Sequence, residues 1–149
     1  MDILLFTTRL CIIACRHMVP YYYKGKHVKA SEIAELYNFK VRSLSPSFTV
    51  LVKAGILSSQ VGGRERGFIF ALDPKTITLY DITHALEGET QIDFCEDALN
   101  CQPLKCEDCS INHELRNLIE ARRVILSSTT IYKHYESKKE MEEKKNINI

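Results

Sequence analysis

The sequence is poor in residues that interrupt regular structure, with 4 Pro and 6 Gly among 149 residues. It also lacks tandem repeats, which excludes a collagen-like or solenoid architecture. Long apolar runs are missing as well, since the longest one near the amino terminus, Ile3 to Phe6, is followed by Thr7, Thr8 and Arg9. Such a short run cannot span a membrane or form the apolar part of a secretion signal. We therefore expect a cytoplasmic protein without a membrane partner.

Patterns typical of enzymes are also absent. The sequence contains no nucleotide-binding glycine signature, and its His, Asp and Glu residues form no acid–base constellation. Hydrophobic residues make up 45% and charged residues 26%, which is the ordinary range of globular proteins. A chain of this length allows one modest domain with a helical appendage, and we expect it not to be an enzyme.

The net charge of +1 conceals an uneven distribution. Residues 1–72 contain ten Lys and Arg against four Asp and Glu, whereas residues 73–149 contain ten against fifteen. A basic amino-terminal half suits binding to a polyanion such as nucleic acid, although a solvated charged face gives the same count. The predicted elements must decide between these two interpretations.

An amino-terminal helix is predicted over residues 5–18, where apolar residues recur at helical spacing until Pro20. It carries Cys11 and Cys15, which we interpret as small buried packing residues. The stretch 21–26, with its three tyrosines, is expected to be a loop that packs over the core.

Two short helices are predicted next. The first covers residues 31–38 with Ser31 as its cap, and the second has Ser45 as cap, Pro46 at its first helical position and Gly55 at its end. A polar link joins them. This arrangement is typical of a helix-turn-helix, in which the second helix reads base edges in the major groove of DNA.

A β-hairpin wing is predicted to follow, with strands over residues 56–61 and 67–72. Its glycine-rich tip can approach a DNA backbone, and Arg64 and Arg66 can neutralise phosphates or enter a narrow minor groove. A hairpin whose arginines only add solubility, or a winged helix that binds a protein instead of DNA, are the alternatives. The residues expected on the operator side are Lys40, Arg42, Ser43, Ser45, Arg64 and Arg66.

The carboxy-terminal half begins with a predicted helix at 79–87, capped by Thr78 and stopped by Gly88. A longer amphipathic helix from Ile111 to about Ser128 is expected to pair with the same helix of a second subunit. The predicted fold class is mainly α with a small β-hairpin wing. We divide the chain into a winged helix-turn-helix DNA-binding domain at 1–88, a cysteine-rich sensor loop at 89–110, a dimerisation helix at 111–135 and a flexible charged tail at 136–149.

The most specific feature is a group of four cysteines with the spacing C-x5-C-x4-C-x2-C, namely Cys95, Cys101, Cys106 and Cys109. Thiolates are soft ligands that suit an iron–sulfur cluster or zinc. Zinc is disfavoured because the second C-x2-C pair is missing. A metal-free thiol switch is a further alternative, although the neighbouring acids oppose it by raising thiol pKa values. The same ligands would also suit an electron carrier.

Several motifs together resemble the bacterial winged-helix regulators IscR, NsrR and CymR, which form the Rrf-two family. The motifs that carry the resemblance lie at residues 31–35, 51–59, 67–68, 77–82 and 85–88, followed by the cysteine-rich loop and a long helix. The resemblance covers residues 5 to 133. It implies a homodimer joined through the long carboxy-terminal helix, a winged helix-turn-helix that binds double-stranded operator DNA, and a sensor of redox state, nitric oxide or cluster supply.

The resemblance also implies an iron–sulfur cluster, of 2Fe-2S or 4Fe-4S type, on Cys95, Cys101 and Cys106. We favour Cys109 as the fourth ligand, with His113, Asp2 or a group of the second subunit as alternatives. One departure from the family concerns Pro46, which falls where related sequences continue the recognition helix. Operator preference is therefore not transferred from the family.

Overall fold

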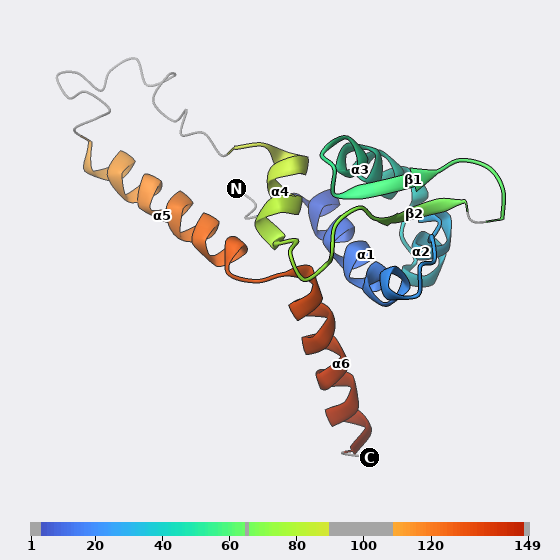
Figure 1. Ribbon diagram of the computed structural model, residues 1–149. Coiled ribbons are helices and arrows are strands. Elements are labelled where there is room, and N and C mark those ends of the chain that lie inside the picture. The colour runs from blue at the N-terminus through green and yellow to red at the C-terminus, as the bar shows by residue number, and fades with distance from the viewer. Residues whose placement is uncertain (1–3, 65, 90–108, 148–149) are drawn as a thin grey trace.

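The helices and strands of the computed structural model follow the order expected for a winged helix-turn-helix chain. The structure describes residues 4–64, 66–89 and 109–147. Its elements are α1 (Phe6–Tyr23), α2 (Ala30–Tyr37), α3 (Val41–Lys53), β1 (Leu57–Gln60), β2 (Gly67–Phe70), α4 (Leu79–Glu87), α5 (Ser110–Ser127) and α6 (Ile131–Ile147). Figure 1 shows α1 to α4 and the hairpin gathered in one body, from which α5 and α6 extend in different directions. The predicted fold class is confirmed.

Helix α1 is longer than predicted. The sequence predicts a helix over 5–18 and a loop over 21–26, but the helix continues through Pro20 and ends at Tyr23. An interior proline removes one helical hydrogen bond. The ring of Tyr22 packs against the hydrophobic core. This tertiary contact favours the additional turn, so residues 21–23 of the expected loop are corrected to helix, while residues 24–26 lie outside it.

Helix α2 begins before its predicted cap. Ser31 lies inside the helix, and Lys29 occupies the N-cap position without a side-chain hydrogen bond. The predicted end is confirmed, because Asn38 is the C-cap with φ of 57° and ψ of 39°. Asn adopts this left-handed conformation more readily than most other residues. The chain therefore turns sharply between α2 and α3.

Helix α3 does not start at Ser45 and Pro46 as predicted. It begins at Val41, so the expected polar link at 40–45 forms its amino-terminal turns and Pro46 lies inside the helix. Proline has no N–H to donate to the carbonyl group four residues earlier, that of Arg42. The candidate recognition helix α3 therefore lacks one helical hydrogen bond.

The buried face of α3 explains why Pro46 is tolerated. Leu44, Phe48 and Leu51 are fully buried, at spacings of four and three residues that continue across the proline. An interior proline costs roughly 3 kcal/mol, whereas full burial of an apolar side chain contributes about 1.5–3 kcal/mol. The burial of Leu44 offsets much of the cost.

The hairpin of β1 and β2 forms the predicted wing with slightly shorter strands. The strands pair antiparallel, with Leu57 opposite Phe70 and Gln60 opposite Gly67. The Leu57 and Phe70 side chains point into the core. The end of the hairpin nearest to α3 is therefore packed, while the other end leads into an exposed loop.

Val28, in the connection between α1 and α2, bridges to the other edge of β2. Its N–H donates to the carbonyl oxygen of Phe68, and the N–H of Phe68 donates to the carbonyl oxygen of Val28, each at 2.8 Å. At Gly67, φ is 140° and a β-carbon would lie 2.6 Å from the Val28 carbonyl oxygen. Only glycine allows this approach of the two backbones. The wing is thereby fixed to the segment that leads into α2.

The core lies where α1, α2, α3 and the hairpin meet. Cys11 and Cys15 are fully buried within it, which confirms their interpretation as packing residues. A hydrogen bond with Cys11, together with burial, raises the pKa of the Cys15 thiol. The Cys15 sulfur therefore behaves as a neutral packing group rather than as a reactive thiolate.

Helix α4 confirms the prediction for residues 79–87 in detail. The Thr78 hydroxyl accepts a hydrogen bond from the Asp81 N–H at 3.0 Å, and the Asp81 carboxylate accepts one from the Thr78 N–H at 2.9 Å. These two bonds are the predicted capping box. The C-cap is Gly88, with φ of 73°.

The carboxy-terminal helices agree with the prediction in one part and correct it in another. The helix predicted from Ile111 to about Ser128 is confirmed as α5. Residues 136–149, expected to form a frayed tail, are helical up to Ile147 as part of α6. An ion pair at i and i+4, between Lys138 and Glu142 at 3.5 Å, supports this helix.

Helix α6 begins on the core. Ile131 is fully buried, and its N–H donates to the carbonyl oxygen of Ile77 at 2.9 Å. Tyr132 and Tyr135 pack against the core from the following turn. Among the described residues, no helix has the length and apolar character needed to cross a membrane.

Candidate nucleic-acid interface and cysteine segment

The first candidate contact surface lies at the amino-terminal end of α3. Lys40 occupies the N-cap position, and the side chains of Lys40 and Arg42 are exposed. Ser43 and Ser45 follow as half-buried residues on the first turns of the helix. A helix amino terminus carries partial positive charge, and these two basic side chains add to it. The arrangement suits contact with a phosphate backbone and with nearby base edges.

The second surface is the tip of the wing. Gly62 and Gly63 have φ of 86° and 82°, so the turn uses a conformation that favours glycine. Arg64 and Arg66 are exposed beside them, and Val61 is 93% exposed. Two guanidinium groups on a protruding, narrow turn can reach phosphates or enter a minor groove.

Aromatic packing joins these two surfaces. The ring of Phe48 on α3 lies 5.0 Å from the ring of Phe68 on β2, at an interplanar angle of 71°. Figure 1 shows the hairpin extending beyond the helices of the body, with α3 packed beside β1. All six residues expected on the operator side are therefore carried by one unit made of α3 and the wing.

The cysteine segment, defined as residues 89–110, is described only at its ends. Cys95, Cys101 and Cys106, three of the four expected ligands, lie outside the described residues, as does Asp2. Among the described residues, no group of three or more His, Cys, Asp and Glu could hold a metal ion. The expected ligand set therefore remains a prediction.

Cys109 is the ligand candidate that the structure does describe. It is half-buried and occupies the N-cap position of α5. Its carbonyl oxygen accepts a hydrogen bond from the N–H of His113 at 3.0 Å, which places His113 in the first turn of the helix, as expected. The His113 side chain is exposed. Its sulfur is a soft donor of the kind that iron and zinc bind.

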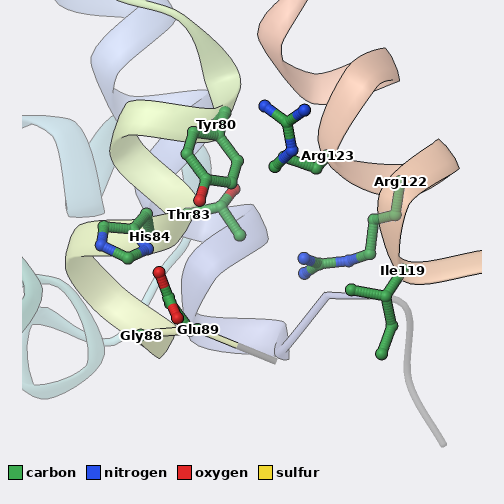
Figure 2. A pocket seen from close by; sticks show the side chains of 8 residues that line it. All are labelled: Tyr80, Thr83, His84, Gly88, Glu89, Ile119, Arg122 and Arg123. Atoms are coloured by element: carbon green, nitrogen blue, oxygen red, sulfur yellow. The ribbon is translucent and has the colours of Figure 1, made fainter. Parts of the chain in front are cut away.

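A cleft of about 200 Å³ lies between α4 and α5. Figure 2 shows Tyr80, Thr83 and His84 on α4 facing Arg122 and Arg123 on α5 across this cleft. Among the described residues, the buried hydroxyl of Thr83 finds no hydrogen-bond partner. The packing between the two helices is therefore incomplete along this stretch.

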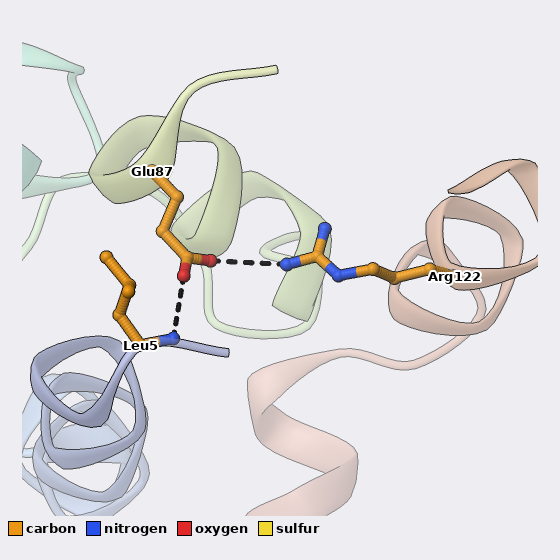
Figure 3. Close-up of polar contacts among 3 residues, drawn as sticks. All are labelled: Leu5, Glu87 and Arg122. Carbon is orange, nitrogen blue, oxygen red and sulfur yellow. Dashed lines mark hydrogen bonds and ion pairs between the residues drawn. The ribbon is translucent and has the colours of Figure 1, made fainter. Parts of the chain in front are cut away.

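One carboxylate connects three elements next to the cleft. Glu87, the last residue of α4, accepts a hydrogen bond from the Leu5 backbone N–H at 2.7 Å through Oε1. Its Oε2 forms an ion pair with Nη2 of Arg122 at 3.2 Å (Figure 3). The side chains of Glu87 and Arg122 are 14% and 21% exposed, so solvent screens this pair only in part.

Sequence patterns alone do not assign a role to Glu87 or Arg122. A signal was nevertheless present in α5, because Arg122 occupies a position in the stripe that otherwise holds Leu and Ile. A charged residue on an apolar stripe predicts a buried or half-buried partner. The identity of the partner depends on the fold, because Glu87 is 35 residues away in the chain.

Cationic groups meet at the contact between α1 and α6. Burial and the nearby charge of Lys138 lower the pKa of His17. Burial and the nearby charge of Arg16 lower the pKa of His134. The Tyr37 hydroxyl lies 3.2 Å from Nδ1 of His17. This contact is therefore most favourable when both imidazoles are neutral.

A family model matches residues 7–136 of the 149 residues, and its description is Rrf2, iron-dependent transcriptional regulator. One curated relative is BadM of Rhodopseudomonas palustris, whose name describes it as an HTH-type transcriptional regulator. It is 32% identical over 106 residues, which are 71% of this chain and 65% of the relative. The chain thus spans just under two thirds of that relative.

Solved structures share the fold. CymR, the global cysteine regulator of B. subtilis, has a TM-score of 0.73 at 20% identity, covering 92% of this chain and 98% of its own. IscR of T. potens has a TM-score of 0.73 at 22% identity, and the match covers 93% of this chain and 89% of the IscR chain. The oxidized form of CymR from Staphylococcus aureus has a TM-score of 0.69 at 21% identity, and the match covers 91% of this chain and 97% of the CymR chain. The family description and the names of BadM and of B. subtilis CymR are those of regulators, in agreement with the expectation that this chain is not an enzyme.

Proposed function

The chain belongs to the Rrf2 family of transcriptional regulators, and we propose that it is a cytoplasmic, dimeric DNA-binding regulator with a cysteine-ligated iron–sulfur sensor. The observation that carries the DNA-binding part is the combination of basic side chains at the start of α3 and on the wing. The contact of Phe48 with Phe68 holds these surfaces in a fixed relation. Such a unit can place a helix in the major groove and a wing on the adjacent backbone.

The proposed roles of the six residues follow from their chemistry. Arg42, Ser43 and Ser45 would contact base edges or phosphates, and Lys40 would contact a phosphate. Arg64 and Arg66 would neutralise phosphates or read a narrow minor groove.

The proposed dimer uses α5. Its exposed residues Ile111, Leu118 and Ile125 recur every seven positions, with exposed fractions of 69%, 62% and 66%. A stripe with this repeat is typical of helices that pair along their length. We propose that it packs against the same stripe of a second copy, which would place two recognition helices on one operator.

The proposed sensor is the cysteine segment. Four thiol donors within fifteen residues fit an iron–sulfur cluster, because iron in such clusters is held by Cys thiolates. Cys95, Cys101, Cys106 and Cys109 would hold it, and the bound cluster would supply a centre that responds to oxidation or nitric oxide. The description of the family as iron-dependent favours iron over zinc.

A metal-free thiol switch is the second candidate function. The observation that favours it is the existence of an oxidized form of S. aureus CymR among the structures of the same fold. In that case Cys residues of the segment would form a disulfide in place of metal bonds. Structural zinc would instead give a colourless, redox-inert protein.

Anaerobic purification of the full chain tests the proposed sensor. We expect bound iron and visible absorption, and we expect both to be lost when Cys95, Cys101 or Cys106 is replaced by Ala. Replacement of the buried Cys11 by Ala is the matched control, and it should leave the absorption unchanged. A colourless, iron-free preparation would contradict the cluster, and zinc or disulfide analysis of the same sample would then separate the alternatives.

A further inference from the structure

Glu87 is the residue through which polar contacts join the start of α1, the end of α4 and α5. One oxygen of its carboxylate accepts from the backbone N–H of Leu5, at the start of α1, and the other pairs with Arg122 of α5. Figure 3 shows the single carboxylate between the two partners. A displacement of α5 that moves Arg122 away from the end of α4 would therefore lengthen or break its ion pair with Glu87.

The bond to Leu5 replaces a cap that α1 does not supply itself. Leu5 is the N-cap residue and offers no side-chain cap, and the first turn of α1 contains no acidic residue. A carboxylate near a helix amino terminus satisfies a free N–H and interacts favourably with the helix dipole. Glu87 thus fixes the start of α1, the central helix of the winged domain, from a distant point of the chain.

The ion pair with Arg122 links α5 to the end of α4. The cleft between α4 and α5 leaves these helices incompletely packed (Figure 2). Arg122 crosses this contact to reach Glu87, whereas the neighbouring Arg123 pairs with Glu120 of its own helix. Loss of the Glu87 pair would therefore weaken the link between helices, and loss of the Glu120 pair would not.

The position of Glu87 in the chain connects it to the sensor. Gly88 follows at once, and the cysteine segment begins at the next residue and leads into α5 at its other end. We propose that Glu87 is the positioning residue through which the state of the cysteine segment changes the placement of the winged helix-turn-helix domain, held at the start of α1, relative to α5. This inference rests on the proposed function, and it assigns the regulation of the same site.

A matched pair of variants tests it in the full chain. Glu87→Gln keeps the size of the side chain and removes the charge that faces Arg122, and Arg122→Gln removes the partner. Glu120→Gln is the control, because it removes a carboxylate from an arginine pair within α5. For each protein, operator affinity is measured after anaerobic reconstitution with iron(II) and sulfide, and again after iron removal by a chelator. Hydrogen exchange of the amides at the start of α1 is measured without DNA.

For the wild type we expect the two affinities to differ by about fivefold or more, the lower end of usual coupling between sites. Glu87→Gln and Arg122→Gln should bring the ratio within about twofold of one. Glu87→Gln should also accelerate amide exchange at Leu5, and Glu120→Gln should change neither quantity. If the wild-type affinities differ and Glu87→Gln keeps the same ratio, the inference is overturned while the proposed function stands. The inference is also overturned if Glu120→Gln reduces the affinity ratio as much as Glu87→Gln does. A wild-type ratio of one overturns the proposed function and the inference with it.

Discussion

The ring of Phe48 stands edge-on to the ring of Phe68, with centroids 5.0 Å apart, and this contact joins the candidate recognition helix to the wing. Phe48 is fully buried. Its replacement by Ala should lower the free energy of unfolding by about 3–5 kcal/mol, because it leaves a cavity between helix and hairpin. Urea denaturation measures this loss. Phe6, 62% exposed, is the control, and Phe6→Ala should cost no more than about 0.5 kcal/mol. Similar losses in both variants would contradict the packing.

The wing arginines should contribute to binding through phosphate contacts. Replacement of Arg64 and Arg66 together by Gln should weaken operator binding and reduce the slope of log affinity against log salt by about two units. Fluorescence anisotropy over a range of salt concentrations measures both quantities. The matched control replaces Lys139 and Lys144 on α6, which removes the same charge away from the wing. An unchanged slope in the wing variant would exclude the wing from the interface.

Gly67 should be intolerant of any side chain. A β-carbon would meet the Val28 carbonyl oxygen at 2.6 Å, and φ of 140° is unfavourable for other residues. Gly67→Ala should therefore cost about 2–3 kcal/mol of unfolding free energy, from strain together with separation of the bridge. Gly63→Ala is the control with open space around it, and only its positive φ should matter, at about 1 kcal/mol. Thermal unfolding followed by circular dichroism ranks the two variants.

Stability should decrease as the pH falls below 6.5, because His17 and His134 have lowered pKa values in the folded chain. Between the folded values and 6.5 the unfolded chain binds more protons, so acidification favours unfolding until the folded pKa values are passed. The double variant His17→Gln and His134→Gln should show a smaller loss of Tm between pH 7.5 and pH 5.5. His113→Gln, which changes an exposed histidine, should retain the decline of the wild type. Equal declines in all three proteins would remove these two histidines from the explanation.

The fourth ligand can be identified by comparing Cys109 with His113. Cys109→Ser should alter the visible spectrum or shorten the lifetime of the cluster, because a C-x2-C pair brings two sulfurs to one centre without straining the chain. His113→Ala should leave both nearly unchanged, since its exposed side chain lies in the first turn of α5. The reverse result would assign the ligand to His113. Insensitivity to both changes would point to the second subunit or an external ligand.

Local sequence signals predicted the elements whose ends are determined by neighbouring residues. The capping box of Thr78 and Asp81 and the turn at Asn38 are examples, because each depends on contacts within a few positions. The helices through Pro20 and Pro46 were predicted incorrectly, since distant core packing offsets the local cost of proline. Sequence patterns also do not predict the contacts between residues far apart in the chain, namely Val28 with Phe68 at the wing and Glu87 with Arg122 at α5. The bridge between Val28 and Phe68 spans 40 residues, and only the folded chain brings such partners together.

The helical carboxy terminus has a similar explanation. Its Lys and Glu residues were interpreted as a solvated tail from their charge alone. The same residues have high helix propensity and can form pairs at i and i+4, as Lys138 and Glu142 do. Attachment of Ile131 to the core provides a fixed first turn from which the helix continues. The many charged residues of this segment therefore correctly predict that most of it is exposed, but the absence of helix inferred from them is wrong.

Genome-wide footprinting of the full-length protein tests the central claim, which is sequence-specific binding of DNA by a dimer of winged helices. We expect protected sites with two inverted half-sites, whose centres are separated by about 10 base pairs or a multiple of that distance. The same sites should lose protection when Arg42, Arg64 and Arg66 are replaced together by Gln. Protection without sequence preference, or a footprint that survives this triple replacement, would contradict the proposed DNA-binding surface.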